Sequence, residues 1–175
     1  MKTLVIHPAD STTDFLCEVY KDLDCTVIRS KTSGSGILRR AIKDHDKIIF
    51  LGHGDPNGLL RDYVFQISYL INSKHVQLLR NKECVYVWCY ADQFVKKYGL
   101  KGFATGMIIS EINEAIDCCV PFKNNEVEKS NEKFAKSLAQ ALQTPLISEM
   151  KNIFHSEYLP KSNVEEFNNN NIFIF

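Results

Sequence analysis

Short apolar runs alternate with amphipathic stretches along most of the chain. The runs are rich in β-branched and aromatic residues, as strands are, while apolar residues recur at helical spacing in the stretches between them. The pattern predicts strands at residues 4–6, 26–28, 47–51, 84–89 and 103–109, and helices around residues 37–42, 73–80 and 91–98. Such regular alternation favours an open, mainly parallel sheet with helices on both faces, which is a three-layer α/β/α sandwich.

Two segments carry more specific local signals. Ser11, with Asp14 three residues later, has the spacing of a capping box, so we predict a helix that begins at Ser11. The β-like pieces at residues 63–65 and 69–71 are predicted to form a hairpin or an edge ribbon.

The last third of the chain contains the clearest helical pattern. Residues 127–142 repeat apolar side chains at every fourth position. A run of asparagines precedes the closing apolar segment, residues 172–175, which we predict to be a terminal strand or a docking segment. We expect one domain, with a core at residues 1–110 and a helical C-terminal extension at residues 111–175.

Composition and charge exclude several classes of protein. Hydrophobic residues make up 45% and charged residues 24%, a balance that excludes a disordered chain. Lys+Arg and Asp+Glu both number 21, so the overall basic surplus of a non-specific nucleic-acid binder is missing. The apolar runs are far shorter than the roughly 20 residues that span a bilayer, and the apolar stretch near Met1 is too short for a signal peptide. We therefore expect a cytoplasmic protein that binds neither nucleic acid nor membranes.

The cysteines and glycines do not indicate a metal or phosphate site. No C-x-x-C pair occurs, and the adjacent Cys118 and Cys119 cannot easily share one tetrahedral metal. We expect the thiols to be reduced and mostly buried. The segment Ser33–Gly36 could hold a phosphate at a helix N-terminus, but it lacks the G-x-G-x-x-G and Walker patterns, so an ordinary turn is the better interpretation. No cofactor is predicted.

Two of the predicted strands run into residues that can carry chemistry. The strand at residues 47–51 leads to His53, which has a glycine on each side, and the strand at residues 84–89 ends in Cys89. Ligands bind at the carboxyl ends of parallel strands, so neighbouring strands would bring the two side chains together. The imidazole can favour the thiolate and later protonate a leaving group, while the Gly54 amide could serve as an oxyanion donor. His7 also ends a strand, and we expect it to fill a loop or cap a helix.

These two blocks resemble a known family. Ile48–Gly54 and Val85–Cys89 are similar to the histidine and cysteine blocks of the caspase-like cysteine peptidases, the clan of caspases, legumains, gingipains, clostripains and separases. The loop Gly54–Leu60 is similar to the one that follows the histidine in legumain-like members, and the strand–helix order agrees from about residue 3 to residue 110. The resemblance implies His53 as the catalytic histidine and Cys89 as the nucleophile. It also implies the backbone N–H groups of Gly54 and Cys89 as the oxyanion hole.

The sequence thus predicts a cysteine endopeptidase that acts on a peptide or protein substrate without a metal or organic cofactor. Asp92, Ser110 and Glu111 follow predicted strands and could shape a substrate pocket, in which acidic residues would favour a basic substrate side chain.

Two alternatives remain open. Val87 and Trp88 stand where family members often carry an acidic residue or glutamine and usually a small residue, which favours a catalytically inactive binding or scaffold module of the same fold. A flavodoxin-like small-ligand binder is favoured only by the fold class and the Ser-Gly repeat.

Overall fold

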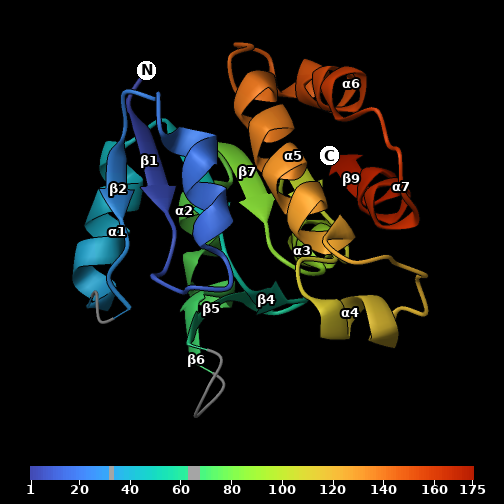
Figure 1. Ribbon diagram of the computed structural model, residues 1–175. Helices are drawn as coiled ribbons and strands as arrows, with labels where there is room; N and C mark the ends of the chain where they lie inside the picture. Colours follow the sequence, from blue (N-terminus) through green and yellow to red (C-terminus); the bar gives the residue numbers. More distant parts are fainter. Residues whose placement is uncertain (32–33, 63–67) are drawn as a thin grey trace.

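A six-stranded sheet runs through the centre of the computed structural model, which describes residues 1–31, 34–62 and 68–175 (Figure 1). The strand order is β2-β1-β3-β7-β8-β9. The strands are β1 (Thr3–Ile6), β2 (Thr26–Ile28), β3 (Lys47–Leu51), β7 (Glu83–Val87), β8 (Phe103–Thr105) and β9 (Ile172–Ile174). All neighbouring strands pair in parallel except β9, which is antiparallel to β8. The predicted α/β fold with a mainly parallel sheet is confirmed.

The strand side chains alternate between two cores, one on each face of the sheet. In β3, Ile48 and Phe50 belong to the first core, while Ile49 and Leu51 belong to the second. This follows from the pleat, in which successive side chains point to opposite faces. The first core lies under α1 (Ser35–Asp44), α2 (Val76–Leu79) and α3 (Ala91–Tyr98), and the second under the 3₁₀ helix η1 (Asp14–Tyr20), α5 (Glu126–Ala141) and α6 (Ile147–Tyr158).

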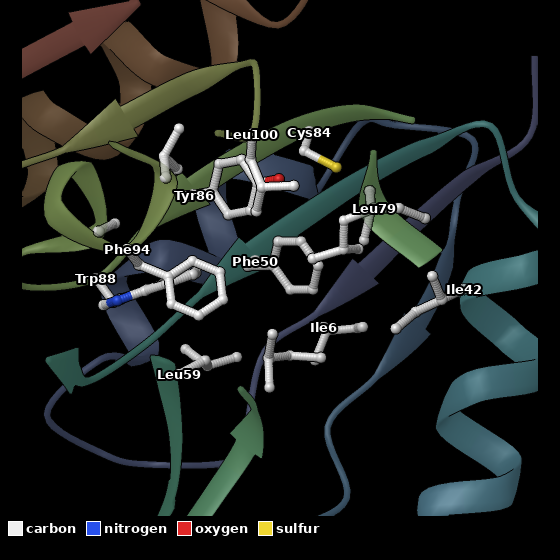
Figure 2. Packing of buried hydrophobic residues seen from close by; sticks show 14 of the residues in the cluster. Ile6, Ile42, Phe50, Leu59, Leu79, Cys84, Tyr86, Trp88, Phe94 and Leu100 are labelled. Carbon is white, nitrogen blue, oxygen red and sulfur yellow. The ribbon is translucent and has the colours of Figure 1, made fainter. Parts of the chain in front are cut away.

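Aromatic rings fill the first core around the end of β7 (Figure 2). The rings of Phe50 and Tyr86 stack with centroids 5.4 Å apart, and Trp88 meets Phe94 edge to face at 5.5 Å. Aromatic pairs in such geometries add to the stabilisation that comes from burial alone. The end of β7 is therefore firmly anchored.

A second, smaller sheet follows β3. It consists of β4 (Gly54–Asp55), β5 (Gly58–Asp62) and β6 (Ser68–Ile71) in antiparallel pairing. In Figure 1 these strands lie beyond the arrowheads of β1 and β7, at the carboxyl end of the main sheet. The piece predicted at residues 69–71 is confirmed as part of β6, and the piece predicted at residues 63–65 lies outside the described residues. β4 and β5 were not predicted, because the turn-forming residues before Gly58 indicate a loop.

The prediction of a capped helix beginning at Ser11 is wrong. The helical segment η1 is a 3₁₀ helix that begins at Asp14, and Thr13, which stands at its N-cap, makes no side-chain capping bond. Instead, Asp10 Oδ1 accepts hydrogen bonds from the backbone N–H of Thr12 at 3.1 Å and from its hydroxyl at 2.8 Å. Asp side chains stabilise such local turns at the expense of helix.

The C-terminal region is helical, as predicted, and it also completes the sheet. It contains α4 (Ile112–Asp117), α5, α6, α7 (Asn163–Asn170) and the final strand β9. β9 pairs with β8, so the predicted terminal strand is confirmed, whereas the strand predicted at residues 103–109 ends at Thr105. Within the described ranges, no helix combines the length and apolar character needed to cross a bilayer.

Candidate active site at the carboxyl edge of the sheet

The two residues singled out by the sequence lie around one cavity. β3 and β7 are neighbours, with Leu51 paired to Val87, and His53 and Cys89 each follow the end of their strand by two residues. Both line a cavity of about 30 Å³, together with Ser110 and a largely apolar wall that includes Phe134. The expectation that His53 and Cys89 come together is confirmed.

A polar chain from the loop after β1 holds His53. Nε2 of His53 lies 2.6 Å from the Thr12 hydroxyl, which itself donates to Asp10 at 2.8 Å. Because a hydroxyl has a single proton, it accepts the proton on Nε2. The contact with Thr12 thereby fixes the imidazole in one tautomer and orientation, because the hydrogen bond at one ring nitrogen decides which nitrogen carries the proton. We missed Asp10 and Thr12 in the sequence, although they follow a strand that ends at the same edge.

The groups around Cys89 favour its neutral thiol over the thiolate. Sγ of this half-buried side chain lies 3.7 Å from the carbonyl oxygen of Ile108 and 3.9 Å from Oε1 of Glu114, and the single thiol proton can be donated to only one of them at a time. Burial raises the pKa of Cys89 to about 12, and the negative charge of Glu114 contributes to the rise. In this conformation Cys89 is therefore a neutral thiol at neutral pH.

The backbone around Cys89 is held on both sides. The Thr105 hydroxyl accepts from the N–H of Trp88 at 3.2 Å and donates to the carbonyl of the same residue at 2.8 Å. Tyr90 is in the left-handed region with φ 65°, and its N–H donates to the carbonyl of Gly106 at 3.0 Å. Strained conformations of this kind in residues other than glycine concentrate at functional sites.

Trp88, the bulky residue before the cysteine, supports the loop that carries His53. Its indole N–H donates to the backbone carbonyl of Asp55 at 3.0 Å. The ring lies against Gly54, where any Cβ would collide with it, so the large residue at position 88 requires glycine at position 54. Trp88 belongs to the first core and also lines the cavity that His53 and Cys89 share.

Of the three residues predicted to shape a substrate pocket, one lines the cavity and two do not. Ser110 lines the cavity. Glu111 is exposed at the N-cap of α4, and Asp92 is half-buried in the first turn of α3. Among the described residues that line this cavity, neither acidic residue is present. Burial raises the pKa of Asp92.

Glu114 is a further residue of the site that we did not find in the sequence. It forms a capping box with Glu111 at the start of α4. The E-x-x-E spacing before an apolar helix was the available signal.

His7 has a structural role, in agreement with the sequence. It is fully buried, with Nδ1 3.0 Å from the Tyr20 hydroxyl and Nε2 3.3 Å from the Thr13 hydroxyl. Burial, followed by the positive charge of Arg29, lowers the pKa of His7 to about 4. The ring is therefore neutral in the folded protein down to mildly acidic pH.

This burial predicts a loss of stability in acid. An unfolded histidine binds its proton near pH 6.5, whereas folded His7 does so only near pH 4, so stability falls as the pH drops through that window. We expect the free energy of unfolding to be about 2 kcal/mol lower at pH 5 than at pH 8 on account of this residue. Urea titrations at both pH values, on wild type and His7→Gln, measure the difference. His75 is present in both proteins, so its titration contributes equally to their pH dependence. If stability depends on pH to the same extent in wild type and in His7→Gln, His7 is not the cause of the loss in acid.

No family model matches the chain, and no curated protein matches it significantly. All six cysteines are free. In the described parts of the chain, no group of three or more His, Cys, Asp and Glu side chains is arranged to hold a metal ion.

Proposed function

We propose that this protein is a caspase-like cysteine endopeptidase in which Cys89 is the nucleophile and His53 the proton donor. The observation that carries this function is the parallel pairing of β3 and β7, because it brings the two side chains to one cavity at the carboxyl edge of the sheet. Perturbed titratable groups at such an edge are typical of catalytic sites.

The reaction needs only the side chains and backbone of this chain. The thiol proton of Cys89 passes to His53, and the thiolate attacks the carbonyl carbon of the scissile peptide bond, so that a C–S bond forms and the carbonyl oxygen becomes an oxyanion. The N–H groups of Gly54 and Cys89 are the proposed donors to that oxyanion. His53 gives the thiol proton to the amine as the C–N bond breaks. Water then attacks the thioester carbon and gives a proton to His53, and the C–S bond breaks, which releases the acid product and restores Cys89. Neither a metal nor an organic cofactor takes part.

The supports around the two residues fit this role. The Asp10–Thr12 chain fixes the imidazole of His53. Thr105 and the Trp88–Gly54 contact fix the backbone that would hold the oxyanion. Such preorganisation lowers the barrier because the donors need no rearrangement during the reaction.

A second function, a binding module of the same fold without turnover, is favoured by one observation. The Cys89 thiol is half-buried, and Glu114 lies beside it as a negative charge. A thiol of this kind is a poor nucleophile at neutral pH. The two functions differ in whether any peptide is cut.

Peptide hydrolysis tests the proposal. A mixture of randomised peptides is incubated with wild type, Glu114→Gln, Cys89→Ala, His53→Ala and the control Cys25→Ala, and the products are read by mass spectrometry. Cys25 precedes β2 at the opposite end of the sheet, so its replacement should leave cleavage unchanged. We expect Cys89→Ala and His53→Ala to lower the rate at least about a thousandfold.

The outcomes separate the two functions. Cleavage by wild type or Glu114→Gln that disappears in Cys89→Ala supports the peptidase. No cleavage by either protein, or cleavage that persists in Cys89→Ala, overturns it, and the first of these results selects the binding module.

A further inference from the structure

Glu114 is held in one orientation by the start of α4. Its Oε2 accepts three hydrogen bonds: from the backbone N–H of Ser110 at 2.7 Å, from the Ser110 hydroxyl at 3.0 Å and from the backbone N–H of Glu111 at 3.0 Å. With one oxygen fixed, the other is directed at Sγ of Cys89, 3.9 Å away. These hydrogen bonds therefore hold the Glu114 carboxylate beside the thiol of Cys89 in this conformation.

The segment that carries these donors is itself anchored. The carbonyl of Ser110 accepts from Asn131 on α5 at 2.8 Å, and both backbone groups of Ile109 bond to the buried Asn168 on α7. Glu114 cannot turn away from Cys89 without breaking several of these bonds. The C-terminal helices thus fix the charge next to the proposed nucleophile.

We propose that Glu114 is a positioning residue that keeps Cys89 protonated, so that the site rests in an unreactive state until the carboxylate is moved or neutralised. This inference rests on the proposed peptidase function and concerns the regulation of the same site. A negative charge beside a thiol disfavours the thiolate, and the effect is strong where water is excluded. Removal of the charge should make Cys89 more reactive without any change in the residues that do the chemistry.

Several other titratable groups surround Cys89. His53 faces the cavity from the loop after β3, Tyr90 follows Cys89 at the start of α3, and Cys118 stands at the end of α4. The anionic forms of Glu114 and Cys118 both raise the pKa of Cys89, after burial itself. Glu114 is the carboxylate among these groups, and its Oε1 lies 3.9 Å from the sulfur.

The test is the pH profile of Cys89 alkylation. Glu114→Gln removes the charge but keeps an acceptor for Ser110 and Glu111, because glutamine serves in a capping box as glutamate does. Glu111→Gln is the matched control, since it removes a carboxylate from the same helix start, where that side chain caps the N–H of Glu114. Limiting iodoacetamide is applied from pH 6 to pH 10, and each cysteine is followed separately by mass spectrometry.

We expect Cys89 in Glu114→Gln to label about tenfold faster at pH 8 than in wild type, with its profile displaced to lower pH. In Glu111→Gln the Cys89 profile should stay close to that of wild type. Cys17 and Cys25 report on the rest of the fold and should label at unchanged rates in both variants. An unchanged Cys89 profile in folded Glu114→Gln would overturn the proposal.

A second variant keeps the test decisive if Glu114→Gln does not fold. Glu114→Asp keeps a carboxylate in the first turn of α4 but withdraws it from the sulfur by one methylene, so an intermediate acceleration is expected. If Glu114→Gln does not fold, and folded Glu114→Asp shows no faster labelling of Cys89 than wild type, the proposed role of Glu114 is overturned.

The peptide assay separates this inference from the proposed function. Faster labelling in Glu114→Gln without any peptide cleavage means that Glu114 controls the thiol of a protein that is not a peptidase. Cleavage by wild type with an unaltered labelling profile in Glu114→Gln means that the peptidase stands and the control by Glu114 fails.

Discussion

Replacement of Trp88 by alanine is expected to lower the free energy of unfolding by about 3–5 kcal/mol. The side chain is 2% exposed and meets Phe50, Tyr86 and Phe94 in the first core, where its loss would leave a cavity between rigid aromatic rings (Figure 2). The variant also loses the hydrogen bond to Asp55, which ties the small sheet to β7. Urea denaturation followed by circular dichroism measures the change.

Trp88→Phe separates the two contributions. It keeps most of the apolar contact but removes the indole N–H, so a loss of about 1–2 kcal/mol is expected from the unpaired carbonyl of Asp55. Under the proposed function, peptide cleavage should fall in both variants, because the loop that carries His53 rests on the indole. A Trp88→Ala protein as stable as wild type would show that this end of β7 is not tightly packed.

Asn168→Ala is the second change with a large expected effect, a loss of about 3 kcal/mol in the free energy of unfolding. Asn168 is fully buried, and its Oδ1 accepts from the N–H of Ile109 at 2.7 Å while its Nδ2 donates to the carbonyl of Ile109 at 2.9 Å. Nδ2 also reaches the Ser130 hydroxyl at 3.1 Å. Alanine would leave both backbone groups of a buried residue without a partner.

Asn170→Ala is the matched control, because Asn170 is an exposed residue of the same helix, α7. Its replacement should change the free energy of unfolding by less than about 0.5 kcal/mol. Thermal and urea denaturation of both variants provide the comparison. Equal effects at positions 168 and 170 would contradict the role of Asn168 in holding the segment behind Cys89.

The main sheet could be predicted because its central strands carry their own signal. Residues 47–51 and 83–87 are buried on both faces, so almost every side chain is apolar and the runs stand out from the helices around them. The end of the strand after Phe103 could not be predicted in the same way. Ile108 and Ile109 are apolar because they lie under other elements, not because they continue β8.

Local competition explains the other errors of prediction. The capping pattern at Ser11 and the turn that Asp10 forms are both short-range possibilities of the same residues. Only the packing of η1 against α5 and the hydrogen bond that Thr12 accepts from His53 decide between them. β5 directly follows a turn-forming segment and contains only two apolar residues, Leu59 and Leu60, so its sequence resembles that of a loop. Its pairing with β4 and β6 defines it as a strand.

The sequence by itself determined the α/β fold and indicated His53 and Cys89 as candidate site residues, because strand patterns and strand-end positions are local properties of the chain. Tertiary structure alone decided the charge around Cys89. Glu114 reaches the sulfur across 25 residues, and Asn168 fixes the intervening segment across 59 residues. Such contacts leave no periodicity in the sequence, since they depend on how α4 and α7 are placed against the edge of the sheet. The same placement turns a cysteine at a strand end into a half-buried, neutral thiol.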